Sequence, residues 1–202
     1  MHVEFLVEEP SAEAALQSLV PRILGPEHAF EVHVFQGVQD LMGKLPNRLR
    51  AYSTWIPDDW YIVVLRDTDR ADCHQLKTTL DTLATQAGLV TKSAAGTGRF
   101  HVMNRLAVEE LEAWFFGDVE ALRAAYPRVP ASLGKQVRYR EPDQIGGGTK
   151  EALHRLLQRN GYHREGVPRI ATAREISSHM DPDRNRSHSF QVFRDGLRAL
   201  VR

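Results

Sequence analysis

Two apolar segments of this chain are each followed directly by acidic residues, which restricts the folds open to it. The first segment, residues 2–7, is followed by Glu8, and the second, residues 61–65, is followed by Asp67 and Asp69. A segment that is apolar throughout is typical of a parallel strand covered by helices on both faces. Carboxylates gathered at the ends of such strands repel one another unless a divalent cation lies between them. The pattern predicts an α/β fold with a metal site at one edge of its sheet.

The first part of the chain alternates between strand and helix patterns. Further strands are predicted over residues 30–36 and 100–106. Apolar residues at helical spacing occur between the strands, beginning at Pro10 and again over residues 45–55, 72–87 and 108–116. This alternation predicts a mostly parallel, doubly wound sheet flanked by helices, in which ligands bind outside the carboxyl ends of the strands.

The last third of the chain has a different pattern. Residues 126–149 contain three prolines and a run of three glycines, which predicts a loop. Helical patterns return over residues 150–157, 171–180 and 190–201. We therefore predict an α/β domain over residues 1–125 and a helical, basic C-terminal elaboration over residues 126–202. The elaboration is either a separate domain or part of the same one.

Charge is divided unevenly between the two parts. The 26 basic and 26 acidic residues balance overall, yet residues 1–120 hold 10 basic and 18 acidic residues, and residues 121–202 hold 16 and 8. Solvated helix faces explain such a split in many proteins. The alternative is that the two parts bind different ligands: acidic residues of the first part would bind cations, and arginines of the second part would bind a polyanion such as nucleic acid.

Several classes of protein are disfavoured by composition. The single cysteine, Cys73, cannot form an internal disulfide or a zinc site of the usual Cys/His type. No segment approaches the roughly 18 apolar residues of a membrane span, and the first residues lack the features of a secretory signal. We expect a cytoplasmic protein with a core of its own and no membrane partner.

Glu8 after one strand and Asp67-Thr68-Asp69 after another resemble the two signature motifs of the Toprim domain of topoisomerases, bacterial primases and overcoming-lysogenization-defect nucleases. The segments LVEEPSAEAAL, LRDTDRADC, RLAVEELEAWFFGD and RNRSHSFQVF more closely resemble the Toprim-like bacterial family called domain of unknown function 4276. This resemblance covers nearly the whole chain. Members are often encoded beside AAA-type ATPases, and relatives act in anti-phage defence. The resemblance implies a nuclease-like subunit with an ATPase partner.

The resemblance also implies roles for single residues. It makes Glu8 a general acid or base or a metal ligand, and it makes Asp67 and Asp69 the ligands of Mg²⁺ or Mn²⁺. Ala12 stands where the nuclease branch has a second carboxylate, and Glu9 stands where a glycine normally follows the glutamate. Both departures favour the alternative of a catalytically silent subunit that binds an ATPase or a nucleotide.

Two more residues are candidates for the chemistry of this site. Glu109 and Glu112 are three residues apart in a predicted helix and would share one face, so Glu112 could supply a further metal ligand. An exposed acidic first turn that complements the helix dipole is the alternative. Lys150 could act as a cation near the leaving group of a scissile phosphate.

A polar cluster before the last predicted helix is a candidate nucleic-acid contact. Arg184 and Arg186 could bind phosphates, with hydrogen bonds from Asn185 and Ser189. Capping of the helix by Ser187 is the alternative explanation. The combined prediction is a Mg²⁺-dependent phosphodiesterase that uses water as its nucleophile and acts on nucleic acid, with DNA favoured over RNA.

Other conspicuous residues have structural explanations. Asp72 and Asp118 are predicted to cap helices. The adjacent aromatic residues Trp114, Phe115 and Phe116 are predicted to lie in the core rather than to stack on bases.

Overall fold

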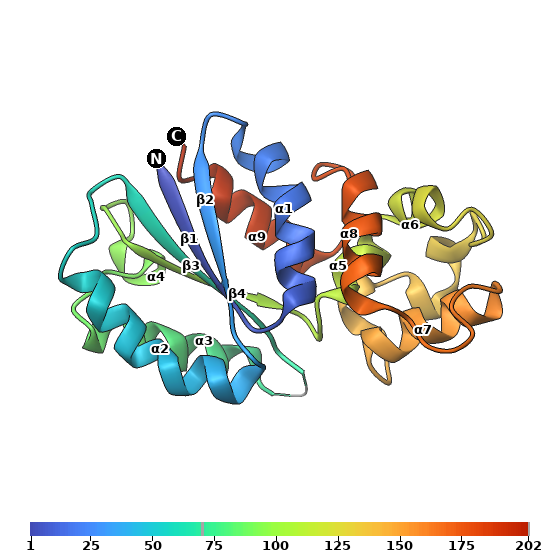
Figure 1. Cartoon of the computed structure of the whole chain (residues 1–202), viewed down its shortest axis with the longest axis horizontal. Coiled ribbons are helices and arrows are strands. Elements are labelled where there is room, and N and C mark those ends of the chain that lie inside the picture. Colours follow the sequence, from blue (N-terminus) through green and yellow to red (C-terminus); the bar gives the residue numbers. More distant parts are fainter. Residues whose placement is uncertain (70, 202) are drawn as a thin grey trace.

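The computed structural model describes residues 1–69 and 71–201 (Figure 1). Four strands form one parallel sheet in the order β2-β1-β3-β4, which confirms the predicted α/β class. The strands are β1 (His2–Val7), β2 (Ala29–Val34), β3 (Trp60–Asp67) and β4 (Val102–Ala107). All four strands were predicted, with limits that differ by at most two residues at each end.

Helices cover both faces of the sheet (Figure 1). The helices α1 (Pro10–Leu24) and α9 (His188–Arg198) lie on one face, and α2 (Val38–Ser53) and α3 (Cys73–Gln86) lie on the other. The chain leaves β1 toward β2 on one side and passes from β3 to β4 on the other side. The strand order therefore reverses between β1 and β3, and in α/β sheets the carboxyl ends at such a point form the usual ligand crevice.

The helical C-terminal part is also confirmed. After α4 (Lys92–Ala95) and β4 come the short helices α5 (Glu112–Gly117) and α6 (Val119–Ala125), then three 3₁₀ turns within residues 133–144. The helices α7 (Thr149–Arg159) and α8 (Arg169–His179) follow and precede α9. Figure 1 shows α6, α7 and the 3₁₀ turns beside the sheet, whereas α8 and α9 return to pack against α1.

Two helix predictions need correction. The pattern over residues 45–55 is the second half of α2, which begins at Val38 and contains Pro46. The helix predicted over residues 108–116 begins at Glu112, because residues up to Glu110 continue the connection that leaves β4. Glu109 and Glu112 therefore do not share a helix face.

The apolar core on the α1 side is continuous across residue 125. It contains Phe5 of β1, Leu19 of α1, Ile176 of α8 and Phe193 of α9, all fully buried. The predicted burial of the aromatic residues 114–116 is confirmed, since each is at most 1% exposed. Across the described ranges 1–69 and 71–201, no helix combines the length and the apolar character that crossing a membrane requires.

Candidate functional site: an acidic rim at the carboxyl edge of the sheet

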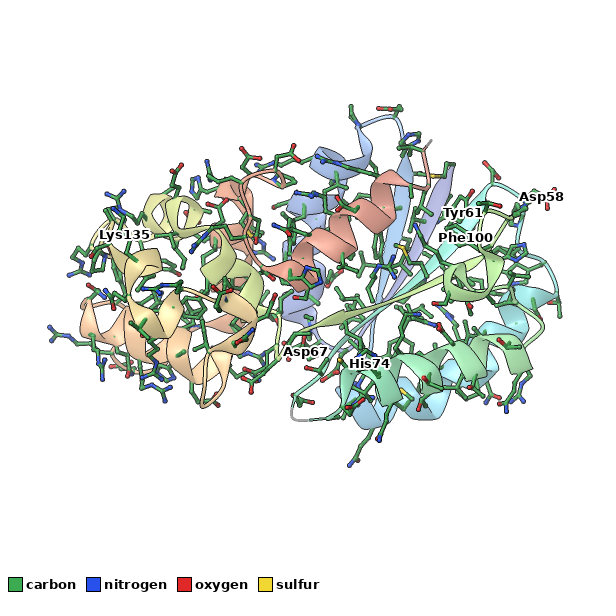
Figure 2. All side chains as sticks on the ribbon, turned by 180° about the vertical axis from the view of Figure 1, so that it is seen from behind. Asp58, Tyr61, Asp67, His74, Phe100 and Lys135 are labelled. Atoms are coloured by element: carbon green, nitrogen blue, oxygen red, sulfur yellow. The ribbon has the colours of Figure 1, made fainter. Side chains whose placement is uncertain are left out.

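The carboxyl ends of β1 and β3 and the segment after β4 bring acidic side chains together, and we call this group the acidic rim. Among the described residues it consists of Glu8, Glu9, Asp67, Asp69, Glu109, Glu110 and Glu112. Figure 2 shows Asp67 where the sheet meets the helical half of the molecule.

Strand pairing explains why these distant residues meet. Val7 pairs with Leu65, so Glu8 follows β1 next to Arg66 and Asp67, the last residues of β3, and Asp67 itself pairs with Ala107 at the end of β4. Two further backbone hydrogen bonds extend this edge: Thr68 N donates to Ala107 O at 2.9 Å, and Asp69 N donates to Glu109 O at 2.8 Å. The sheet thus positions the loop after β3 against the segment that leads into α5.

Three carboxylates of the acidic rim have raised pKa values. Burial, followed by the charge of Asp69, raises the pKa of Glu8 to about 6. Burial, followed by the charges of Glu112 and Glu8, raises the pKa of Asp67 well above its usual 3.8. Glu112 is 4% exposed, and chiefly its burial raises its pKa to about 7. The site therefore holds more negative charge than its surroundings stabilise.

Three basic side chains of the described chain reach the acidic rim. Arg169, from the start of α8, forms an ion pair with Glu9 and approaches Glu112 Oε1 to 3.8 Å. Arg66 Nε lies 3.9 Å from Glu8 Oε2, and Lys150 Nζ lies 3.6 Å from Glu110 Oε1. The structure thus brings Lys150 to the rim. Because the pKa values of Glu8 and Glu112 are raised in spite of these neighbours, the basic residues do not neutralise the site.

The donor atoms of the rim suit a hard divalent cation. Glu8 Oε2 and Glu112 Oε2 are buried and accept no hydrogen bond from the described residues. A buried carboxylate oxygen without a partner is unfavourable, and carboxylate oxygens are the ligands that Mg²⁺ and Mn²⁺ prefer. The chain from 1 to 69 and from 71 to 201 has one trio of ligand atoms within 4.8 Å of one another, and it lies elsewhere. The described carboxylates of the rim thus lie at one edge of the sheet without three of their oxygens within that distance of one another.

A hollow of about 320 Å³ lies beside the rim. It is lined by Asp69, Glu109, Glu110, Gly147, Gly148 and Glu151. Glu110 binds the beginning of α7, since it accepts hydrogen bonds from Lys150 N at 2.7 Å and from Thr149 Oγ1 at 3.1 Å. The glycine-rich loop before α7 is in this way fixed next to the acids.

The two departures from the Toprim pattern have clear structural settings. Ala12 is 6% exposed and lies in the core under α1, where a carboxylate would be buried among apolar side chains. Glu9 has an extended backbone, with φ −150°, so the turn does not need the left-handed conformation that favours glycine. Its side chain accepts a hydrogen bond from Ser11 Oγ at 2.6 Å and pairs with Arg169.

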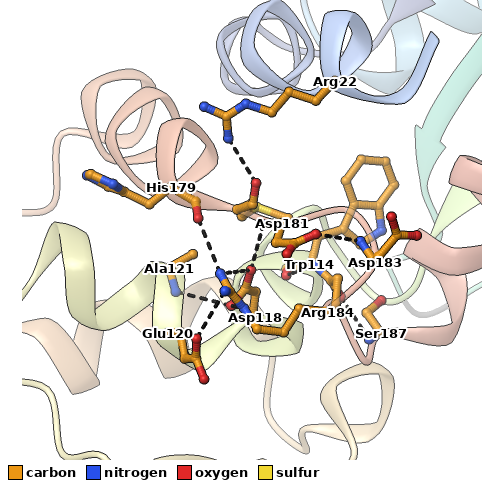
Figure 3. A network of polar contacts seen from close by, with 12 residues as sticks. Arg22, Trp114, Asp118, Glu120, Ala121, His179, Asp181, Asp183, Arg184 and Ser187 are labelled. Atoms are coloured by element: carbon orange, nitrogen blue, oxygen red, sulfur yellow. Dashed lines mark hydrogen bonds and ion pairs between the residues drawn. The ribbon is translucent and has the colours of Figure 1, made fainter. Parts of the chain in front are cut away.

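Of the predicted nucleic-acid cluster, Arg184 lies at Asp118, the residue that follows α5 (Figure 3). Arg184 donates to both carboxylate oxygens of Asp118 at 2.8 and 2.9 Å. Asn185 is 1% exposed and donates to Trp114 O at 2.8 Å.

The remaining members of that cluster divide between the interior and the surface. Ser189 is buried, accepts from Trp114 Nε1 at 3.1 Å and donates to Asp143 at 2.9 Å, while Arg186 is exposed. Ser187 caps α9 through Phe190 N at 3.2 Å, as the alternative explanation predicted. The interior contacts of Arg184, Asn185 and Ser189 stabilise the fold, and a phosphate contact by these residues stays a prediction.

Glu110 and Arg169 are residues of the site that the sequence reasoning missed. Arg169 is the first residue of α8, where a cation opposes the helix dipole. An arginine at the start of a helix therefore indicates an acidic partner elsewhere in the fold. This position was the one signal in the sequence that could have identified Arg169 as a residue of the site. The capping role of Glu110 has no local signal, because the helix that it caps begins 39 residues later.

Comparison with known proteins gives one match. A family model described as Domain of unknown function (DUF4276) matches residues 7–198, a range that includes every member of the acidic rim. No curated protein and no solved structure matches the chain.

Proposed function

The chain belongs to the DUF4276 family, a domain of unknown function, and on that premise we propose that it is a metal-dependent nuclease of the Toprim type. The observation that carries the proposal is the joint rise of three pKa values. Glu8, Asp67 and Glu112 come from three separate segments, meet at one edge of the sheet, and all bind protons more tightly than usual. Carboxylates paired with structural arginines have lowered pKa values, so this excess of buried negative charge supports a cation site.

The residues of the rim fit the parts of a phosphodiesterase. Glu8, Asp67, Asp69 and Glu112 would hold a Mg²⁺ or Mn²⁺ ion, which when bound stabilises negative charge on the attacking and leaving oxygens of a phosphodiester. In the alternative role that the resemblance implies, Glu8 would accept a proton from water instead of binding the ion. Lys150, at the same edge, offers a positive charge for the leaving oxygen.

The substrate and the partners follow from charge and from the family resemblance. Residues 121–202 carry 16 basic and 8 acidic residues, which supports a polyanionic substrate. We propose nucleic acid, with DNA favoured over RNA. The Toprim-like resemblance supports assembly with a AAA-type ATPase encoded nearby, in a system of anti-phage defence.

Plasmid nicking tests the proposal. Supercoiled plasmid is incubated with the purified chain and Mg²⁺ or Mn²⁺, and the Asp67→Asn and Glu8→Gln variants are compared with wild type. We expect each variant to lower the nicking rate by about 100-fold, in line with the loss of a group that stabilises the transition state. Glu165→Gln, which changes an exposed glutamate between α7 and α8, should keep the wild-type rate. Wild-type protein that nicks nothing, or equal nicking by all variants, would refute the nuclease proposal for this chain alone.

A silent interaction subunit is the second candidate. It is favoured by Arg169, which contacts Glu9 and Glu112 in the way that a bound cation would, and by Ala12 in place of a second carboxylate. Mn²⁺ binding followed by electron paramagnetic resonance separates the two candidates. Binding that depends on Asp67 without any nicking would support the silent subunit, and binding together with nicking would support the nuclease.

A further inference from the structure

Neighbouring strands of the sheet carry mirror-image tripeptides. They are His2-Val3-Glu4 in β1 and Glu31-Val32-His33 in β2. The two strands are parallel, with Glu4 opposite Glu31 and Leu6 opposite His33. Because alternate residues of a strand share a face, the polar residues of both tripeptides lie on one face of the sheet, which α2 covers.

These side chains converge on one point. Ligand atoms of Glu4, Glu31 and His33 all lie within 4.8 Å of one another. Glu4 is 4% exposed and makes three hydrogen bonds: with His33 Nε2, with His2 Nε2 at 2.7 Å, and with the hydroxyl of Tyr52 at 2.8 Å. Burial alone would raise the pKa of Glu4, but the hydrogen bonds from His33, Tyr52 and His2 hold it below its usual 4.5.

Arg48 defines the protonation of His33. Its Nη2 lies 2.8 Å from His33 Nδ1, and a guanidinium can only donate, so Nδ1 accepts this hydrogen bond. A neutral His33 must then carry its proton on Nε2 and donate to Glu4. Arg48 lines the same pocket as Glu4 and Glu31, and its own Nε is buried without a hydrogen-bond partner among the described residues.

A pocket of about 280 Å³ opens beside this cluster. Glu4, Glu31, His33, Arg48, Tyr52 and Trp55 contribute to its lining. Glu31 and Trp55 are exposed, so the pocket can be reached from solvent. The cluster is separate from the acidic rim, because Glu4 pairs with Ile62, five residues before Asp67 at the carboxyl end of β3.

We propose that this pocket binds a divalent transition metal of the zinc class through Glu4, Glu31 and His33, with the remaining position open to the pocket. Two carboxylates and one imidazole are a ligand set that zinc uses, whereas Mg²⁺ prefers an all-oxygen octahedron. His2 and Tyr52 orient Glu4 through hydrogen bonds, as partners behind a metal ligand do.

Binding requires one proton shift within His33. The metal bonds to the lone pair of Nε2 when the ring proton resides on Nδ1, and Nδ1 then no longer accepts from Arg48. The Arg48 side chain must therefore turn away from Nδ1 as the metal binds Nε2, so metal binding and the hydrogen bond from Arg48 exclude each other. This inference stands independently of the proposed nuclease activity.

Calorimetric titration of Zn²⁺ into the chelator-treated full chain, with Mg²⁺ in excess, tests the proposal. We expect one zinc ion per chain, bound at least about tenfold more weakly by His33→Gln and by Glu31→Gln. Glu31 is exposed, so Glu31→Gln should fold, and circular dichroism verifies this. Arg48→Met, which removes the competing hydrogen bond, should bind zinc more tightly than wild type.

Two controls separate this site from the acidic rim. Asp67→Asn and Glu165→Gln should bind zinc as wild type does, and Co²⁺ in place of zinc should give a visible absorption band that His33→Gln loses. The proposal fails if the wild-type chain binds no zinc, if both ligand variants bind it as well as wild type, or if Asp67→Asn abolishes the binding.

Discussion

Glu112 begins α5 with 4% of its surface exposed and a pKa of about 7. In the unfolded chain its pKa is near the usual 4.5, so the folded protein binds this proton more tightly. The contribution of such a group to stability is present below pH 4.5 and is lost as the pH rises through about 7. Glu8 acts in the same direction, with a folded pKa of about 6.

Glu112→Gln should therefore reduce the loss of stability that occurs as the pH rises from 4.5 through about 7. A shift from 4.5 to about 7 corresponds to a free energy of unfolding on the order of 3 kcal/mol for this group. We expect the wild-type protein to lose stability between pH 4.5 and pH 8, and the variant to lose less of it. Urea unfolding at both pH values measures the difference, with Glu165→Gln as the exposed control. Equal pH dependence in the wild type and Glu112→Gln would show that the charge of Glu112 is compensated after all.

At the scale of elements, two aspartates cap helices in different surroundings. Asp72 is exposed, and its side chain accepts a hydrogen bond from Gln75 N at 2.8 Å. Asp118 is buried and accepts from Ala121 N at 3.1 Å, from Asp181 N at 2.9 Å and from Arg184 (Figure 3). Asp118 thus joins α6 to the loop between α8 and α9, in addition to capping its own helix.

The same substitution at these two caps should have different costs. Asp72→Ala removes one cap and should lower the free energy of unfolding by about 1 kcal/mol. Asp118→Ala also removes the buried carboxylate that accepts hydrogen bonds from Arg184 and Asp181 N, and should lower it by about 3 kcal/mol. Denaturant unfolding of both variants measures this ratio. Equal losses would mean that the bonds from Asp118 to Arg184 and Asp181 add nothing to the capping of α6.

Helices and strands were predicted well from the sequence where their limits depend on neighbouring residues alone. The predicted limits of β1 and the capping by Asp72 and Ser187 are confirmed because they depend on neighbouring residues only. The start of α2 was missed because Gly43 and Pro46 indicate a break, yet both lie inside the helix, which its packing on the sheet stabilises. The start of α5 was missed because Glu109 O accepts from Asp69 N, a contact from a different strand connection.

At the scale of the whole molecule, the sequence predicted which acids follow the strands but not what surrounds them. Parallel pairing brings Glu8 and Asp67 to one edge, and strand patterns are enough to predict that. Arg169 reaches the same edge only because α8 packs along α1, and no local pattern encodes this packing. The cluster of Glu4 and His33 was missed for a similar reason. Its residues lie in two separate strands, and no local pattern in either strand indicates that they meet.

The fragment 1–125 should not fold as an independent unit. It would expose the α1 side of the core, which in the complete chain is covered by Ile176 of α8 and by Phe190 and Phe193 of α9. We expect the fragment to bind a hydrophobic dye and to unfold without a cooperative transition, in contrast to the full chain. Thermal circular dichroism and dye fluorescence measure this. A cooperative fragment would instead establish residues 1–125 as a separate domain.

The ion pair between Glu9 and Arg169 joins positions that are 160 residues apart. A ribosome makes the acids of β1 and β3 early and the arginine late, and contacts so distant along the chain form slowly. A nascent polypeptide therefore holds its carboxylates without this counter-charge for most of its synthesis. The arrival of this counter-charge at the acidic rim is accordingly a late step, which follows the packing of α8 along α1.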